Sequence, residues 1–244
     1  MTACTRKALV VMPALNEQGS VAAVIAHVKT SMPDVDVLVV DDGSSDDTAK
    51  LARQAGAEVA RLAVNLGVGG AMRTGFRYAL ARGYDVVIQV DADGQHDPDE
   101  LAALLDAVRD ADIVIGSRFA GKGVYRARGP RRYAMVALSL VFSGLAKTKL
   151  TDVTSGFKAM GPRAIRLFAG YYPAEYLGDT VESLVMAIRA GLKIREVPVI
   201  MRERACGRPS HSPVKSAVYL GRAGLALLLA LIRRRPAADS SDSA

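Results

Sequence analysis

The sequence predicts an α/β domain with a mostly parallel central sheet flanked by helices. Short runs rich in Val, Leu and Ile alternate with longer amphipathic runs, which is the order of repeated β-α-β units. Half of the 244 residues are hydrophobic but only 5% are aromatic, so the chain can bury a large, mainly aliphatic core. Polar residues gather directly after the apolar runs, at the end of the strands where parallel sheets bind ligands.

In the first half of the chain, apolar runs of strand length are separated by segments of helical periodicity. The predicted strands are 8–12, 37–40, 58–60, 85–90 and 112–116. The predicted helices run from Asn16-Glu17 to about Lys29, over 49–55, from a Gly-rich turn at 65–71 to Leu80, and from Pro98 to about Asp110. Asp46 or Ser45 can cap the second helix and Asp97 the fourth, because their side-chain oxygens accept free backbone N–H groups.

The second half of the chain is less regular. Residues 121–132 are typical of a Gly- and Arg-rich loop, and 133–145 are almost wholly apolar. A strand entered from 151–158, helices at 162–168 and 179–190, and a strand at 193–201 follow. Gly191 suits the end of the last helix, and Pro198 predicts a sheet edge or a bulge. We expect one domain at 1–210, a basic and apolar helical segment at 211–235, and a disordered tail at 236–244.

The composition favours anionic partners. A net charge of +7 suits nucleic acid, an anionic membrane face or phosphorylated substrates. The basic residues are not interleaved with aromatic ones and no zinc-finger pattern occurs, so nucleic acid is the weakest of the three. Cys4 and Cys206 are far apart and have no metal-ligand neighbours, which predicts a reducing, cytoplasmic compartment. Residues 1–7 lack the apolar region of a signal peptide.

The stretch from Asp91 to His96 is the strongest candidate for binding chemistry. Asp91 and Asp93 follow a buried strand at positions i and i+2, where their carboxylates would repel each other without a cation between them. Mg²⁺ or Mn²⁺ accepts such ligands and keeps other positions for water and phosphate. A solvated acidic turn is the alternative. Further polar residues expected at the same edge of the sheet indicate one shared site; they are Asn16, Glu17, Asp41, Asp42, Asn65 and Arg118.

Several motifs resemble those of a family 2 glycosyltransferase, which has the GT-A fold. In order, they are Pro13-Ala14-Leu15-Asn16-Glu17, Val40-Asp41-Asp42-Gly43-Ser44-Ser45-Asp46-Asp47-Thr48, Asn65-Leu66-Gly67-Val68-Gly69-Gly70-Ala71 and Asp91-Ala92-Asp93-Gly94-Gln95-His96. Gly116-Ser117-Arg118-Phe119, Thr154-Ser155-Gly156-Phe157 and Glu196-Val197-Pro198-Val199 are similar to the branch that transfers hexoses to dolichol or polyprenyl phosphate. Each motif is weak alone, but the ordered set, which covers roughly 9–210, is specific.

The resemblance implies roles for residues on the donor side. Base and ribose would lie near the first two motifs, and glycine backbone would approach the nucleotide closely. The implied nucleotide-binding set is Pro13, Asn16, Glu17, Asp42, Gly67, Gly70 and Asp91. The implied metal ligands are Asp91, Asp93 and Gln95, the last by similarity to the family's third ligand. We expect His96 to be a hydrogen-bonded turn residue, and we leave Ser44, Ser45 and Asp46 out of the site.

The resemblance also implies a lipid phosphate as acceptor. Such a phosphate is already anionic, so it needs charge neutralisation more than a general base, and guanidinium groups bind phosphate bidentately. The expected acceptor-phosphate set is Arg118, Arg131, Arg202, Arg204 and Ser210, although the run before Ser210 departs from the family pattern. With a hydroxyl acceptor, Asp152 or Glu182 becomes the candidate base. The expected catalytic set is Asp93, Arg118, Asp152 and Glu182.

We therefore expect an inverting, metal-dependent transfer of a hexose from a UDP- or GDP-sugar to a polyprenyl phosphate. The protein would be peripheral at the inner face of the plasma membrane. Two alternatives stay open: a hydroxyl acceptor on a polysaccharide, glycolipid or small molecule, and a nucleotide-binding module without transfer activity. The apolar runs 133–145 and 214–232 are candidate membrane contacts as well as candidate core helices; the uninterrupted apolar core of the second, 223–232, is too short to span a bilayer.

Overall fold

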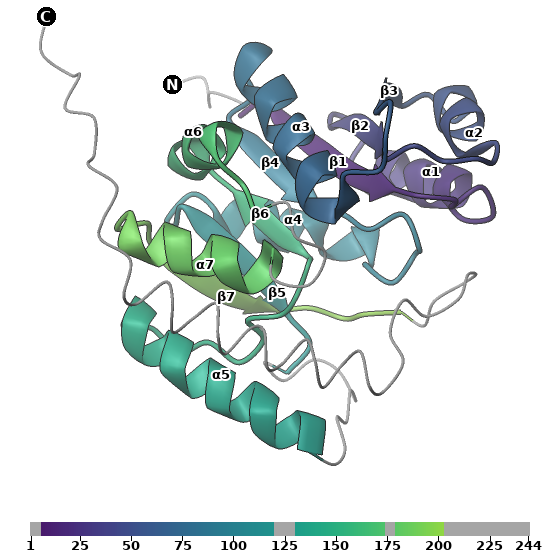
Figure 1. Cartoon of the computed structure of the whole chain (residues 1–244). Helices are drawn as coiled ribbons and strands as arrows, with labels where there is room; N and C mark the ends of the chain where they lie inside the picture. Colours follow the sequence, from purple (N-terminus) through teal and green to yellow (C-terminus); the bar gives the residue numbers. More distant parts are fainter. Residues whose placement is uncertain (1–5, 120–129, 174–178, 203–244) are drawn as a thin grey trace, which may run out of the picture.

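The computed structural model of the chain describes residues 6–119, 130–173 and 179–202. Seven strands form one sheet in the order β3-β2-β1-β4-β6-β5-β7 (Figure 1). They are β1 (Ala8–Ala14), β2 (Asp36–Asp41), β3 (Glu58–Arg61), β4 (Val86–Gln89), β5 (Ile113–Ser117), β6 (Lys158–Met160) and β7 (Ile194–Pro198). All neighbouring strands pair in parallel except β6, which runs antiparallel to β4 and β5. The predicted mostly parallel sheet is confirmed.

Helices cover both faces of the sheet. They are α1 (Val21–Ser31), α2 (Thr48–Gln54), α3 (Gly67–Ala81), α4 (Leu101–Ala107), α5 (Pro130–Ala146), α6 (Pro162–Gly170) and α7 (Asp179–Arg189), with a 3-10 turn at Pro98–Glu100. Side chains of α1, α2 and α4 pack in one hydrophobic cluster and those of α3, α5, α6 and α7 in the other. Strand residues alternate between the two clusters, as Val10 and Val11 do, which is why these strands are apolar throughout.

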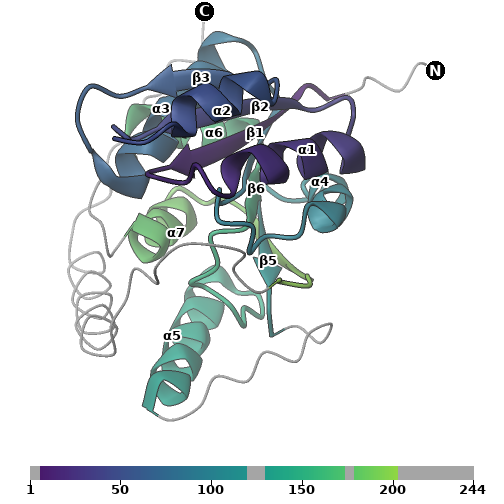
Figure 2. The ribbon, with the colours of Figure 1, turned by 90° about the vertical axis from the view of Figure 1, so that its right-hand side faces the viewer.

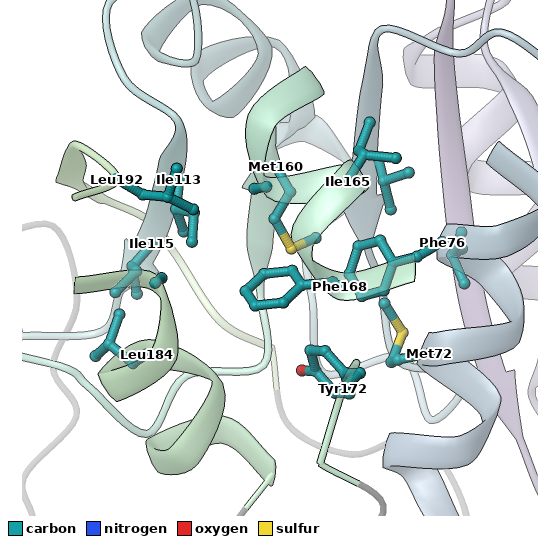
Figure 3. Packing of buried hydrophobic residues seen from close by; sticks show 14 of the residues in the cluster. Met72, Phe76, Ile113, Ile115, Met160, Ile165, Phe168, Tyr172, Leu184 and Leu192 are labelled. Carbon is teal, nitrogen blue, oxygen red and sulfur yellow. The ribbon is translucent and has the colours of Figure 1, made fainter. Parts of the chain in front are cut away.

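Aromatic rings form the centre of the cluster beneath α3 and α6. The Phe168 ring lies 5.2 Å from the Phe76 ring and 5.1 Å from the Tyr172 ring, centroid to centroid. Figure 3 shows these rings between Met72 and Met160. Ile113, Ile115 and Leu184 continue the same cluster further along this face of the sheet. This packing fixes α3 and α6 against the strands whose ends carry the polar turns.

Two helix starts differ from the sequence prediction. Helix α1 begins at Val21 rather than at Asn16-Glu17, because Asn16 has a left-handed backbone (φ 55°) and its N–H donates to Ser44 Oγ. Helix α3 begins at Gly67, so the Gly-rich run predicted as a turn is the helix's first turn. Helix α5 likewise begins at Pro130, inside the stretch predicted as a loop.

Most other local predictions are confirmed. The Asp97 carboxylate accepts the Asp99 N–H at 3.2 Å, with Pro98 at the first helical position, although this first turn is a 3-10 turn and α4 already ends at Ala107. The N-cap residue of α2 is Asp47, whose side chain makes no cap hydrogen bond, so the predicted cap by Ser45 or Asp46 is one residue off; Asp46 Oδ1 nevertheless accepts the N–H of Thr48, the first helical residue, at 3.0 Å. Gly191 follows α7 with φ 70°, and β7, which contains Pro198, is an edge strand of the described sheet. The predicted segments from 203 onward lie outside the described residues. Among the described helices, none is long and apolar enough to cross a bilayer.

Candidate active site

The polar turns meet at one edge of the sheet. Strands β1, β2, β4 and β5 are parallel, so the residues that follow them lie at the same edge. Because β6 is antiparallel to β4 and β5, the segment that enters β6, 151–157, lies at this edge too. The shared edge of β1, β2, β4 and β5 is the one that the sequence pattern predicts, and the antiparallel β6 adds a motif from the second half of the chain to it.

Asn16 and Glu17 tie the turn after β1 to the turn after β2. Besides the Asn16–Ser44 bond, Asn16 Oδ1 accepts the Ser45 N–H at 2.9 Å. Glu17 N–H donates to Thr48 Oγ1 at 2.8 Å. The serines that sequence reasoning left out of the site therefore hold the two turns in register.

Pro13 lies in β1, where that strand has a neighbour on one side only. It is in register with Val40 of β2, whereas the pairing with β4 ends at Val11. A proline, which has no N–H, is tolerated at such a position because no second ladder needs a donor.

Asp42 anchors the start of α3. Its two carboxylate oxygens accept the N–H groups of Leu66 and Gly67 at 2.7 and 2.8 Å. Burial raises the pKa of Asp42, and these two backbone donors offset part of the rise. A β-carbon on Gly70 would lie 2.3 Å from the Leu66 β-carbon, so tight packing of this first helical turn already requires a glycine there. Asp42 and Gly70, both predicted to bind nucleotide, thus have structural roles as well.

The acidic turn after β4 presents carboxylates of different exposure. The Asp91 side chain is 38% exposed, whereas Asp93 is 5% exposed and its Oδ1 accepts the Gln95 N–H at 2.9 Å. Two carboxylates and the amide oxygen of Gln95, all within five residues, are hard oxygen donors of the kind that Mg²⁺ and Mn²⁺ bind. The donor set of this turn therefore fits such an ion.

His96 holds Asp91 in place. Its Nδ1 accepts the Asp91 N–H at 3.0 Å, and its Nε2 lies 3.5 Å from Asp91 Oδ2. The ring is 4% exposed and stacks on Phe157, with centroids 4.7 Å apart and planes 13° from parallel. His96 is the hydrogen-bonded turn residue that the sequence predicted. The role of Phe157 as its platform was missed, because nothing in the sequence pairs residues so far apart.

A second group of ligand-type side chains lies beside the turn. His27, Asp97 and Asp99 bring ligand atoms within 4.8 Å of one another. Arg202, however, approaches both carboxylates, with Nε 2.9 Å from Asp97 Oδ2 and Nη2 3.5 Å from Asp99 Oδ2. The arginine already neutralises this group, so the acidic turn is the better candidate for a cation.

Arg118 forms a buried ion pair with Asp152. Nε donates to Asp152 Oδ2 at 2.6 Å and Nη2 to Oδ1 at 2.7 Å, with the Asp152 side chain fully buried and that of Arg118 18% exposed. Glu196 of β7 fixes the other side of this loop by accepting the N–H groups of Thr151 and Asp152 at 2.8 and 2.7 Å. Asp152 therefore orients Arg118, and Glu196, which the sequence marked only as part of a motif, orients Asp152.

One loop joins this ion pair to the acidic turn. Thr154 Oγ1 accepts a hydrogen bond from Arg118 Nη2 at 3.1 Å. Two residues on, a β-carbon on Gly156 would lie 3.4 Å from Asp91 Oδ2 and 3.6 Å from His96 Cε1. Arg118 and Asp91 thus adjoin the same short segment. Lys158, two residues after Gly156, lies in β6 in the middle of the sheet and is only 4% exposed. The sequence pattern does not indicate this buried basic residue.

Of the remaining predicted residues, the structure describes the side chains of Arg202 and Glu182. The Arg202 guanidinium is bound by Asp97 and Asp99, although its backbone N–H donates to the Gln95 carbonyl at 2.9 Å. Glu182 is half-buried on the first turn of α7. The side chain of Arg131, and both Arg204 and Ser210, lie outside the described part of the structure.

Comparison with known proteins identifies relatives over most of the chain. The family model "Glycosyl transferase family 2" matches residues 9–167. An undecaprenyl-phosphate mannosyltransferase of Micrococcus luteus is 37% identical over 215 residues, covering 84% of this chain and 88% of that protein. A polyprenol monophosphomannose synthase of Mycolicibacterium smegmatis is 33% identical, covering 88% and 85% of the two chains.

Solved structures share the fold. Glucosyl-3-phosphoglycerate synthase of Mycobacterium tuberculosis superposes with a TM-score of 0.70 and 22% identity, covering 93% of this chain and 80% of that one. The same enzyme has been solved with Mn²⁺ and UDP and with Mg²⁺ and UDP. At this identity the likeness concerns the fold, which is the GT-A fold that the sequence predicted.

Proposed function

The chain is a member of glycosyl transferase family 2, and from that premise we propose that it transfers a hexose from a UDP- or GDP-sugar to a polyprenyl phosphate. Two relatives that match most of the chain are named for transfer to undecaprenyl phosphate or for synthesis of a polyprenol monophosphomannose. Mannose is therefore the first sugar to test. The family resemblance further implies inversion at the sugar carbon.

On the donor side, the edge formed by the turns after β1 and β2 would take the nucleotide. Pro13 lies near the end of β1, Asn16 and Glu17 lie on the turn after it, and Asp42 holds the start of α3. With both Asp42 oxygens engaged by backbone N–H groups, we assign Asp42 to holding the start of α3 at this edge, and Asn16 and Glu17 to contacting base or ribose. Gly67 and Gly70 keep the first turn of α3 close to this edge.

The acidic turn would hold a divalent cation, with Asp91, Asp93 and Gln95 as ligands. When bound, the cation would supply positive charge that stabilises the nucleoside diphosphate as a leaving group. The His96 imidazole accepts the Asp91 N–H and thereby fixes the backbone that carries the Asp91 carboxylate. Stacking on Phe157 keeps the imidazole ring in place. The protein's own part is thus a rigid set of oxygen donors.

The burial of Asp152 and its pairing with Arg118 favour a phosphate over a hydroxyl as the acceptor. A hydroxyl acceptor needs a base to remove its proton, but the Asp152 carboxylate is fully buried and bound bidentately by Arg118. A phosphate acceptor is already anionic. One of its oxygens would attack the anomeric carbon as the bond to the diphosphate breaks, the bond electrons leave with the nucleoside diphosphate, and no proton moves. Arg118, oriented by Asp152, would face the phosphate.

A polyprenyl phosphate is held in a membrane, so the protein would act as a peripheral enzyme at the inner face of the plasma membrane, where nucleotide sugars are available. The test is incubation of the protein with GDP- and UDP-hexoses, Mg²⁺ or Mn²⁺, and a polyprenyl phosphate. We expect one donor to yield a lipid-linked hexose. Slow donor hydrolysis with no lipid product from any donor would instead support a hydroxyl acceptor.

A further inference from the structure

Helix α5 presents an apolar face to solvent. Val136, Leu140 and Val141 are 51%, 69% and 43% exposed, and Ala137 and Gly144 on the same side are exposed as well. The opposite side of the helix is also apolar, because Met135, Leu138 and Phe142 are buried in or beside the core. A helix that is apolar on all sides is expected in a core or against lipid, not at a water-facing surface.

The position of α5 leaves this face open. Figures 1 and 2 both show α5 at the end of the molecule opposite α1 and α2, packed beside α7. Its outer side therefore faces away from the rest of the described fold.

In the sequence, the charged residues within α5 and in the segments that flank it are all basic. Between Asp112 and Asp152 the sequence has no Asp or Glu; its basic residues there are Arg118, Lys122, Arg126, Arg128, Arg131, Arg132, Lys147 and Lys149. Lys147 and Lys149, directly after the helix, are exposed. The two bounding carboxylates are already engaged, Asp152 by Arg118 and Asp112 by Arg163 at 2.9 Å. An apolar face followed by the exposed Lys147 and Lys149, in a stretch of sequence without Asp or Glu, is complementary to an anionic lipid surface.

The inner side of α5 is hydrogen-bonded to the loop that orients Arg118. Ser139 Oγ donates to the Thr151 carbonyl at 3.1 Å, and Ser143 Oγ accepts the Leu150 N–H at 2.9 Å. Asp152, the partner of Arg118, follows directly. A surface lying on the outer side of α5 would thus be about one helix diameter, ~10 Å, from the loop proposed to serve the acceptor.

We propose that α5 docks the protein on an anionic phospholipid bilayer, with Val136, Leu140 and Val141 at the boundary of headgroups and acyl chains. Lys147 and Lys149 bind headgroup phosphates. The inference rests on the proposed function in that docking brings the lipid-phosphate acceptor to Arg118, but lipid binding itself is measured without any donor or acceptor.

The experiment is cosedimentation of the full chain with vesicles of phosphatidylglycerol and phosphatidylcholine in equal parts, and with pure phosphatidylcholine vesicles. The test variant carries Leu140→Asp and Val141→Asp. The matched control is Leu80→Asp, because Leu80 is 49% exposed on α3, at the other end of the molecule. Circular dichroism and thermal unfolding establish that each variant is folded.

We expect the double variant to lose partitioning by about tenfold or more, because burial of a single Leu already changes an equilibrium constant by that factor. Leu80→Asp should partition like the parent. Lys147→Gln and Lys149→Gln should each weaken binding to the anionic vesicles by about fivefold and leave the neutral vesicles unaffected.

Unchanged partitioning of the double variant, or an equal loss in Leu80→Asp, overturns the proposal. So does a dimer in lipid-free buffer that the double variant abolishes while vesicle binding persists, because the face would then belong to a second copy. A loss of vesicle binding as expected, together with no sugar transfer in the parent, would support docking and reject the proposed acceptor.

Discussion

Replacement of Asp152 by Asn removes the charge that pairs with Arg118 while keeping the size of the side chain. Asp152 is fully buried and the Arg118 side chain is 18% exposed, so the substitution removes a carboxylate charge that faces this guanidinium in a buried site. Breaking such a pair by removing one partner costs about 3–5 kcal/mol of unfolding free energy. For a chain of this size we expect the Tm to fall by about 6–20 °C.

The same variant separates two roles for Asp152. If it orients Arg118, Asp152→Asn raises the KM for polyprenyl phosphate and leaves the shape of the pH profile of kcat unchanged. If it were the base, the acidic limb of that profile would disappear. The control is Asp106→Asn, whose pair with Arg109 at 3.5 Å is largely exposed on both sides and should affect neither quantity measurably. A Tm for Asp152→Asn equal to that of the parent would show that the ion pair with Arg118 does not stabilise the fold.

Three further predictions concern the turns. Asp93→Asn should abolish Mn²⁺-dependent turnover and weaken Mn²⁺ binding, measured by calorimetry, whereas parent-like binding would remove Asp93 from the cation site. His96→Ala should weaken Mn²⁺ binding by about 10–100-fold through the loss of the Asp91 N–H acceptor, and an unchanged affinity would show that the imidazole positions nothing there. Burial tends to raise the pKa of Asp46, but hydrogen bonds from the Thr48 side chain and N–H and from the Gln18 N–H outweigh it and lower this pKa. The stabilising contribution of Asp46 is therefore present above the unfolded pKa of 3.8 and is lost as pH falls through the lowered folded pKa. Asp46→Ala, which removes the acceptor oxygens, should accordingly destabilise the protein by about 1 kcal/mol at neutral pH, with a difference that shrinks as acid titrates the parent; a constant difference down to low pH would contradict the assignment.

The fold was largely predictable because its signals are local. The apolar runs that became β1, β2, β4 and β5 are continuous, and Pro198 correctly marked an edge strand. The antiparallel entry of β6 was not predictable from any run, yet it is what brings Thr154–Phe157 against the acidic turn.

The contacts within the candidate site depend on residues distant in sequence. Arg118 and Asp152 were each singled out, but their pairing follows from the β5–β6 arrangement and not from spacing. The predicted start of the first helix at Asn16-Glu17 was wrong for the same reason, because the Asn16 N–H donates to Ser44, 28 residues away. The hydrogen bonds from the Leu66 and Gly67 N–H groups to Asp42 could not be predicted either, because a carboxylate followed by Gly is equally typical of a turn and of a ligand site.

The reaction proposed for this protein is transfer of a hexose to a lipid phosphate at the edge of the sheet where Asp91 and Arg118 lie. The most direct measurement is mass spectrometry of lipid extracted after incubation of the full chain with GDP-mannose or a UDP-hexose, Mn²⁺ and polyprenyl phosphate. We predict one added hexose on the lipid phosphate, formed by the parent protein and not by Asp93→Asn or in the presence of a chelator. Unmodified lipid phosphate, alongside glycosylation of a hydroxyl acceptor in the same reaction, would contradict the claim.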